Sequence, residues 1–346
     1  MQGHRVGIAL ALFAVIAVSS DGVLVKLASK EGASVVSVII FKSFTAALTM
    51  AFLQLTVEPL LSVMQGQKAV FFPPVSRLGL AHICTGGGFS MVVFVGFTLS
   101  FYFTTSANVL AFTALAPIWT SLLAKPVLGE RVLWRTVWAN VGALLGTVVV
   151  VIGVALFGGE TSSAQGAING IICAILTGLA SAGYFVTNRS AHVRAPGTPM
   201  VYAGLLGMIL ATLLGLALTP VLHPSSASLA PPRAAILYLV LNGCCCVALA
   251  LFALTLAFRF SPPSSVSLIM QLEGLLGPIS TYLILNEIPS PFTLAGGSLV
   301  LLMVIGHEAL IIFLPVGDGV APNRQDPEGG EPEVPGLLKP VEMRKQ

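Results

Sequence analysis

The chain has 346 residues, of which 55% are hydrophobic and only 9% are charged, and its formal net charge is +3. A soluble domain carries about a quarter charged residues, so this composition excludes an ordinary soluble protein and predicts apolar surface that faces a lipid bilayer. The net charge is small and its charges are scattered, which excludes nucleic acid as a partner.

The N-terminal segment allows two interpretations. Arg5 is followed by an apolar run over residues 6–18, a pattern that resembles a secretory signal peptide. The run resumes after Asp21 and Gly22 with the sequence VLVKL, and no A-x-A cleavage signature lies between. We therefore expect a retained first helix rather than a cleaved signal.

Apolar runs recur along most of the chain. Each reaches the ~20 residues that a helix needs to cross hydrocarbon. About ten spans are predicted, at residues 6–27, 35–56, 78–100, 103–124, 133–157, 165–188, 199–222, 234–258, 263–285 and 292–314. The sequence therefore predicts an all-α membrane protein with ten transmembrane helices.

Two long stretches of the chain, 101–130 and 258–287, share one pattern. Sliding the first onto the second superposes Phe101 on Phe258 and Glu130 on Glu287, and the hydropathy agrees throughout although identities are few. This indicates a duplicated membrane unit. We expect two five-helix repeats at residues 1–157 and 158–314, joined by the polar residues 158–166.

The distribution of Lys and Arg predicts the orientation. One set of loops carries Arg5, Lys68, Arg77, Lys125, Arg131, Arg135, Arg189, Arg194 and Arg259. The opposite set has only Lys30 and Arg233, with Lys26 near a helix end. Basic loops stay cytoplasmic, so both termini are expected in the cytoplasm. An odd number of spans per repeat then makes the two repeats inverted. Nothing in the sequence favours the plasma membrane over an internal membrane.

Residues 315–346 differ sharply from the rest, with few apolar residues and many Gly, Pro and Glu. Such a segment cannot bury enough surface to offset the entropy of ordering it. We expect a disordered cytoplasmic tail.

Three charged residues of the first two spans are candidates for a site, because a charge at membrane depth costs at least ~2.5 kcal/mol and usually faces a cavity or a partner. Asp21 could bind a solute directly or form a structural ion pair with Lys26 or Lys42. Lys26 could equally extend to the outer headgroups. Lys42 lies deeper, and we expect it to face a cavity.

Glu273 is the sharpest candidate. It lies near the middle of the ninth span, close to Gln271. It is followed by Gly274 and by the pair Gly277-Pro278. Proline and glycine weaken the helix there, so a carboxyl group and freed backbone groups would form a site for a solute or a coupling ion such as a proton. The alternative is a glutamate held by Lys42 or by a backbone group.

The fourth span contributes Asn108, Thr113, Pro117 and Trp119. Pro117 superposes on Gly274 in the repeat, so both spans are expected to be weakened at equivalent depth. Trp119 could stack on a ring-bearing solute, or pack against lipid or a neighbouring helix.

Other features of the sequence favour structural roles. Gly142, Gly146 and Gly153 recur along one helix face and predict close helix packing, within the chain or in a homodimer. His307 and His82 are expected to anchor helices at the membrane interface.

Motifs of catalysis and of metal or cofactor binding are absent from the sequence. It has no Cys-x-x-Cys or His-x-Cys metal spacing, phosphate-binding loop, nucleophile elbow or HExxH. We expect no enzyme, metal or cofactor.

The repeats resemble the EamA-type units of the drug/metabolite transporter superfamily over roughly residues 6–314. In the fourth span the resemblance is carried by Thr105-Ser106-Ala107, Pro117 and Gly129-Glu130. The ninth span matches with Ser264-Ser265, with Gly274 in place of Pro and with Asn286-Glu287 in place of Gly-Glu. Ser20-Asp21 and Lys26 match the first-span motif, and Lys42 stands where the second span usually has Arg.

The resemblance implies a ten-helix carrier of small organic solutes that works by exchange or by coupling to an ion gradient. Residues 271–274 replace the lysine-bearing signature of nucleotide-sugar carriers, which argues against that substrate class. We expect a secondary transporter working by alternating access. Its candidate substrate-binding residues are Asp21, Lys26, Lys42, Asn108, Trp119, Gln271 and Glu273.

Within this set, Lys42 and Lys26 would attract an anionic group, while Glu273 would bind a cationic group or a coupling proton. The alternative is a membrane receptor or scaffold that keeps the carrier fold without moving a solute.

Overall fold

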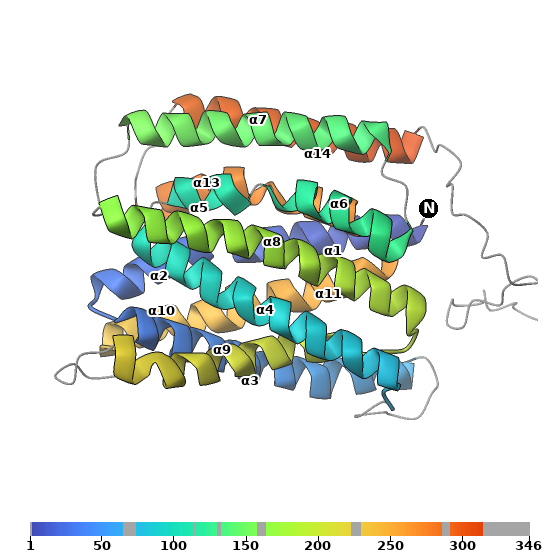
Figure 1. Cartoon of the computed structure of the whole chain (residues 1–346), viewed down its shortest axis with the longest axis horizontal. Helices are drawn as coiled ribbons and strands as arrows, with labels where there is room; N and C mark the ends of the chain where they lie inside the picture. The colour runs from blue at the N-terminus through green and yellow to red at the C-terminus, as the bar shows by residue number, and fades with distance from the viewer. Residues whose placement is uncertain are drawn as a thin grey trace, which may run out of the picture. The chain divides into compact units, whose positions relative to one another are not determined.

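The structure is a computed structural model that describes residues 2–64, 74–104, 106–113, 115–129, 133–157, 164–222, 230–285 and 291–313. These residues form fourteen α-helices and one π-helical segment, with no β-strand among them (Figure 1). Lys68, Thr105, Glu130, Arg131, Asn286, Glu287, most of the predicted linker and the whole predicted tail lie outside them.

In chain order the elements are α1 (Gln2–Val18), α2 (Asp21–Lys30), α3 (Val35–Met64), α4 (Arg77–Phe103), α5 (Ser106–Thr113), α6 (Ala116–Leu128), α7 (Trp134–Phe157), α8 (Ala164–Arg194), α9 (Val201–Leu222), α10 (Arg233–Leu241), η1 (Asn242–Ala248), α11 (Leu249–Phe260), α12 (Pro263–Met270), α13 (Glu273–Leu285) and α14 (Pro291–Phe313).

Six helical segments within the described residues are long and apolar enough to cross a membrane. They are His4–Lys30, Val35–Val57, Arg77–Phe103, Ile168–Arg194, Val201–Pro220 and Arg233–Phe260. Each coincides with one of the ten predicted spans. The other four predicted spans fall on α5 with α6, on α7, on α12 with α13, and on α14.

Three predicted spans are interrupted part-way. The first breaks between α1 and α2, the fourth between α5 and α6, and the ninth between α12 and α13. Pro117 is the second residue of α6 and has no N–H to extend a helix that precedes it, which accounts for the second break. Gly274 follows the first residue of α13, where its high backbone entropy weakens the helix. The equivalent weakening predicted for these two positions is therefore seen as a break in both spans.

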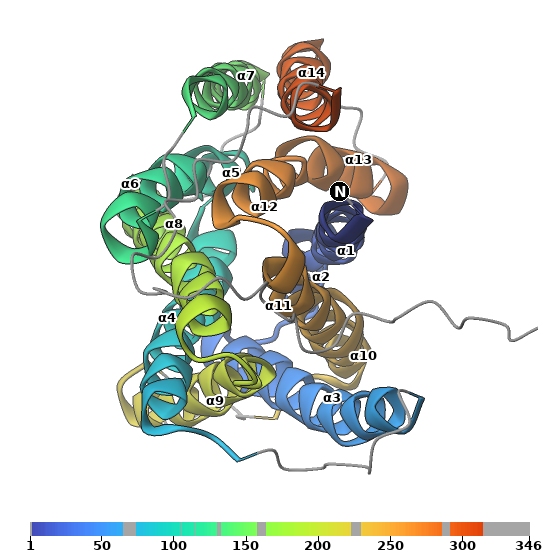
Figure 2. The same ribbon diagram turned by 90° about the vertical axis from the view of Figure 1, so that its right-hand side faces the viewer.

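The long helices pair distant parts of the sequence. α4 packs on α8 and α9, α3 on α9, α1 on α11, and α7 on α14. Figure 2 shows α7 beside α14 at one edge of the bundle and α3 beside α9 at the opposite edge. Every pair takes one helix from each predicted repeat, so the two halves interlock, and the described residues form one compact unit.

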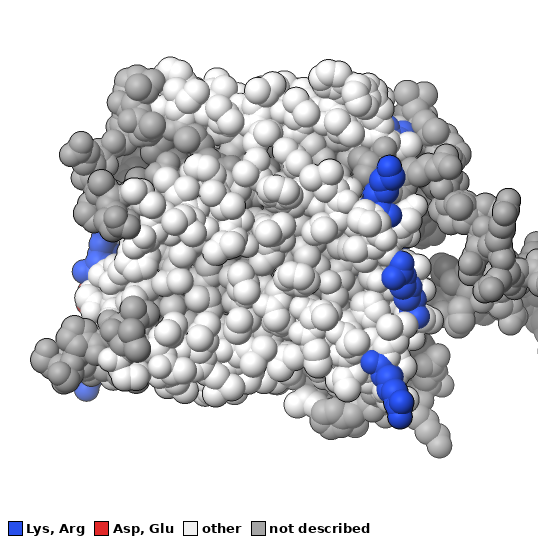
Figure 3. Space-filling view, in the orientation of Figure 1, with Lys and Arg blue, Asp and Glu red and all other residues white. Residues whose placement is uncertain are grey.

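Basic side chains gather at the two ends of the helices. The face in Figure 3 has Lys and Arg at both ends and an uncharged band between them. At the end of the bundle where α1, α4 and α9 begin, here named the basic end, the described chain carries Arg5, Arg77, Lys125, Arg135, Arg189, Arg194 and Arg259. The opposite end carries Lys30 and Arg233. The uncharged band is the surface that a bilayer requires.

α7 and α14 approach closely because glycines line their contact. A Cβ on Gly146 would lie 2.6 Å from the carbonyl oxygen of Gly296, and a Cβ on Gly142 would collide with Met303 Sδ. These two members of the predicted small-residue stripe thus pack within the chain. The surroundings of Gly153, the third member of the stripe, lie outside the described part of the structure.

Two histidines also join helices. His307 is only 3% exposed, and its Nε2 lies 3.0 Å from Thr136 Oγ1, which ties α14 to α7. The expectation that His307 anchors the helix at the membrane interface is therefore wrong, because a buried ring cannot contact headgroups. His82 Nε2 lies 3.1 Å from Ser190 Oγ and links α4 to α8.

Gly146→Ala should destabilise the protein, by about 1–3 kcal/mol, because its Cβ would meet a backbone oxygen that cannot move aside without shifting α14. The measurement is thermal unfolding of the purified protein in detergent. Gly306→Ala in α14 is the matched control, because no atom lies within 4 Å of that Cβ. Equal unfolding temperatures for the two variants would contradict the tight contact.

Candidate functional site

A cavity lies in the middle of the helical bundle. About 130 Å³ of it is open to the centres of water-sized molecules, which is room for on the order of ten waters or a small organic solute. Its apolar lining comes from Ala14, Val18, Val93, Phe94, Phe97, Leu110, Ala116, Pro117, Phe185, Val247, Ala250, Leu251, Leu254, Met270 and Gly274. Its polar lining comes from Asp21, Lys42, Ser90, Thr113, Ser181, Tyr184, Ser267, Gln271 and Glu273.

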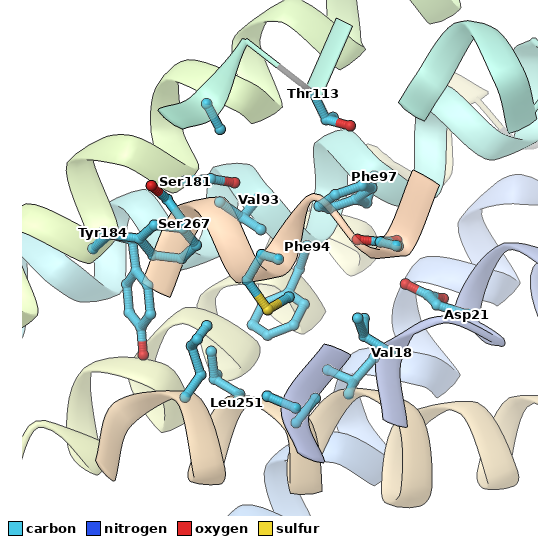
Figure 4. A pocket seen from close by; sticks show the side chains of 18 of the residues that line it. Val18, Asp21, Val93, Phe94, Phe97, Thr113, Ser181, Tyr184, Leu251 and Ser267 are labelled. Carbon is cyan, nitrogen blue, oxygen red and sulfur yellow. The ribbon is translucent and has the colours of Figure 1, made fainter. Parts of the chain in front are cut away.

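The lining has two differing ends. Figure 4 shows Asp21 and Phe97 toward one end of the cavity and Tyr184, Ser181 and Ser267 toward the other. The Tyr184 hydroxyl lies 3.1 Å from Thr255 Oγ1, so it bonds to α11. The Ser267 hydroxyl donates to the Ser264 carbonyl oxygen at 3.0 Å. These groups are therefore already paired within the protein.

A buried ion pair forms the charged end of the cavity. Lys42 Nζ donates to both carboxylate oxygens of Asp21, at 2.7 and 2.9 Å, and lies 3.4 Å from Thr98 Oγ1. Lys42 is 1% exposed and Asp21 4%. In a low-dielectric interior neither charge is tolerated alone, so each makes the burial of the other possible. The ion pair between Asp21 and Lys42, one of the two roles predicted for Asp21, is thus present.

Asp21 is held by two further local features. It is the first residue of α2, where the partial positive charge of a helix N-terminus stabilises a carboxylate. Asn242, the first residue of η1, donates to the Asp21 carboxylate at 2.8 Å and to its backbone carbonyl at 3.0 Å. A π-helical turn carries an extra residue and often re-aims a side chain at a functional site. Here η1 ties the eighth span to the break in the first.

Glu273 occupies a comparable position but has a different environment. It is the first residue of α13, directly after the break at residues 271–272, and it lines the cavity. Within the described part of the chain its carboxylate has no hydrogen bond and no ion pair. The Asp21 carboxylate repels it and the Lys42 ammonium attracts it, but Lys42 bonds to Asp21 instead. The alternative of a Glu273 locked to Lys42 is therefore not seen.

The structure brings four of the seven candidate residues to the cavity, namely Asp21, Lys42, Gln271 and Glu273. Lys26 is half-buried on α2 and does not line it. Trp119 is half-buried on α6 away from the cavity, and its Nε1 is buried without a hydrogen-bond partner among the described groups. Asn108 lies in α5, and its side chain is outside the described part.

Sequence reasoning missed several polar residues of this region. Asn242 and Thr98 complete the ion-pair network, and Ser181 and Tyr184 line the cavity from α8. Asn242 could have been noticed as an amide inside the apolar run ILYLVLNGCCC. Hydroxyl groups gave no such signal, because Ser and Thr are common in membrane helices and usually bond to their own backbone.

Within the described residues, no group of three or more His, Cys, Asp or Glu side chains lies close enough to hold a metal ion.

Lys42→Met should destabilise the protein by about 3–5 kcal/mol, because it leaves the Asp21 carboxylate buried without its partner. The double variant Asp21→Asn with Lys42→Met should recover part of this loss. Thermal unfolding in detergent measures both. Lys30→Met, at the exposed end of α2, is the control and should change little. An unfolding temperature for Lys42→Met equal to that of the control would refute the structural role of the pair.

Comparison with known proteins identifies the family of this chain. The sequence profile of the EamA-like transporter family matches residues 5–152 and 168–306. A solved crystal structure of a protein with 17% sequence identity superposes with a TM-score of 0.63, covering 89% of this chain and 98% of that one. At that identity the likeness concerns the fold. No curated protein sequence matches the chain.

The two matched segments together contain all four predicted residues that line the cavity. The chain belongs to the EamA-like transporter family, and it is a multi-pass membrane transporter of the drug/metabolite type.

Proposed function

We propose that this protein is a secondary-active transporter that moves a small organic solute through the central cavity by alternating access. The observation that carries the proposal is the origin of the lining. Asp21 and Lys42 come from the first family-matched segment, and Gln271 and Glu273 from the second. A site shared by two repeats can open to either side when one repeat moves against the other.

The proposed architecture is ten transmembrane spans in two inverted five-helix repeats, 1–157 and 158–314. Chain direction supports it, because α1 begins at the basic end and α8 begins at the opposite end (Figure 1). Helix breaks support it as well. α5 and α6 are separated at the same relative position in their span as α12 and α13 in theirs.

The proposed orientation places the basic end in the cytoplasm, because positively charged segments near span ends are retained there. α1 begins at that end and α14 runs toward it, so both termini would be cytoplasmic. A short epitope tag before Gln2 should then bind an impermeant antibody only after cells are permeabilised. Binding to intact cells that carry the protein at their surface would contradict this orientation.

Glu273 is the proposed solute- or ion-binding group. Its carboxylate faces the cavity at a helix break and has no partner within the described chain, whereas the Asp21 carboxylate is already bonded by Lys42 and Asn242. A group that must bind and release a ligand in each cycle cannot be permanently occupied by a protein partner.

Glu273→Gln should abolish uptake into proteoliposomes, or uncouple it from the ion gradient, because it removes the charge and keeps the shape of the side chain. Uptake of radiolabelled amino acids, amines, organic acids and sugar phosphates with and without an imposed proton gradient measures this. Glu31→Gln is the matched control, since Glu31 is exposed beyond the end of α2.

Unchanged uptake and unchanged gradient dependence in Glu273→Gln would refute the role of Glu273. Absence of any uptake by the folded wild-type protein, together with no stabilisation by any solute, would favour a receptor or scaffold that keeps the carrier fold.

A further inference from the structure

We propose that the solute is an organic cation, a protonated amine carried on an apolar or aromatic body, and that Glu273 binds its ammonium group. The inference rests on the proposed function and specifies its substrate class. It follows from which cavity groups are already bonded within the protein and which are not.

The basic group in the cavity has no N–H donor left to bind an anionic solute. Lys42 is the single basic side chain among the described lining residues. An ammonium group has three N–H donors. Two of them reach the carboxylate oxygens of Asp21, and the third is directed to Thr98 Oγ1. Binding an anion at Lys42 would first require the buried ion pair to be broken.

Helix N-termini are the other common anion sites in transporters, and five N–H groups of the helices that begin at the cavity are already bonded within the chain. The N–H groups of Gly274, Leu275 and Leu276 in α13 bond to the carbonyl oxygens of residues 271 and 272. In α6, Pro117 has no N–H, and the N–H groups of Ile118 and Trp119 bond to the Leu115 carbonyl.

The N-terminus of α2 already carries an acidic residue and lies against an aromatic ring. Asp21 places its own carboxylate there. The Phe101 ring covers the next residue, since a Cβ on Gly22 would lie 2.8 Å from Phe101 Cε1. A carboxylate or phosphate that approached the N–H groups of α13 or α6 named above would therefore have to displace a bond made within the protein.

Glu273 provides the opposite chemistry. With the Asp21–Lys42 pair neutral overall, an ionised Glu273 gives the described cavity lining a net charge of −1. A protonated amine is the complementary ligand, because it supplies both the charge and the N–H donors that the carboxylate lacks.

The remaining wall selects the body of the solute. Phe94 and Phe97 of α4, Leu110 of α5, and Leu251 and Leu254 of α11 face the cavity. Aromatic rings near a bound ammonium add cation–π attraction. The wall therefore favours an amine with an aliphatic or aromatic body over a polyhydroxylated one such as a sugar.

The test compares matched ligands on the full-length protein in detergent. The probes are butylamine, 2-phenylethylamine and tryptamine, together with the alcohol and the carboxylate that replace the amine of each. Binding is measured by thermal stabilisation and isothermal calorimetry. At least one amine should bind, and its alcohol and carboxylate should bind about 10–100-fold more weakly, since a charge-assisted hydrogen bond is lost.

Variants locate the binding group. Glu273→Gln should weaken the amine by a similar factor, Glu273→Asp should retain part of the affinity, and Glu31→Gln should leave it unchanged. Unfolding temperatures without ligand establish that each variant is folded. If Glu273→Gln does not fold, Glu273→Asp still tests the role of the carboxylate.

Three results would overturn the proposal: no binding by any of the amines, equal binding of an alcohol or carboxylate partner, or amine binding that persists in Glu273→Gln. Transport is measured separately from binding, as uptake into proteoliposomes. An amine that binds through Glu273 but never crosses the membrane would contradict the transporter function and leave the cation site standing. Glu273-dependent uptake of an anion would contradict the cation site and leave the transporter.

Discussion

The structure depends on one constraint: inside hydrocarbon, every backbone polar group and every charge must find its partner within the protein. Three of the predicted spans are interrupted, and all three breaks meet at the same cavity. At two of them the first residue of the new helix is acidic, Asp21 and Glu273, so a carboxylate lies on each helix N-terminus. The charge of Asp21 is balanced by Lys42, which joins the first span to the second. The cavity is the place where irregular backbone is tolerated, because it is surrounded by protein.

The two carboxylates divide the chemistry of the site between them. Asp21 receives Lys42 and Asn242 and becomes part of the framework, whereas Glu273 remains directed at the cavity without a partner in the described chain. This difference arises from the neighbours rather than from the residues. Both are acidic, both follow a helix break, and both lie at equivalent ends of short helices. A fixed pair beside an open carboxylate gives a site with a rigid shape and a single exchangeable charge.

Much of the fold could be predicted from the sequence, because helix length and apolar composition are local properties. Six of the predicted spans coincide with helices long enough to cross a bilayer, and the weakening at Pro117 and Gly274 is seen as helix breaks. The site was less predictable, because it depends on contacts between distant spans. From the sequence, Asp21 could pair with Lys26 or Lys42. The packing of α2 on α3 places Lys42, rather than Lys26, beside the Asp21 carboxylate. Asn242 was missed since its role depends on a π-helical turn that composition does not reveal.

The interlocked pairing of helices has a consequence for how the protein is made. Translation delivers α1, α3 and α4 to the bilayer before α8, α9 and α11 exist, so the faces that will receive these partners are first covered by lipid or by the insertion machinery. Asp21 and Lys42 enter the membrane together, but the amide of Asn242 reaches them only when more than half of the chain has been synthesised. Final assembly is a late, chain-wide event rather than the addition of one finished half to another.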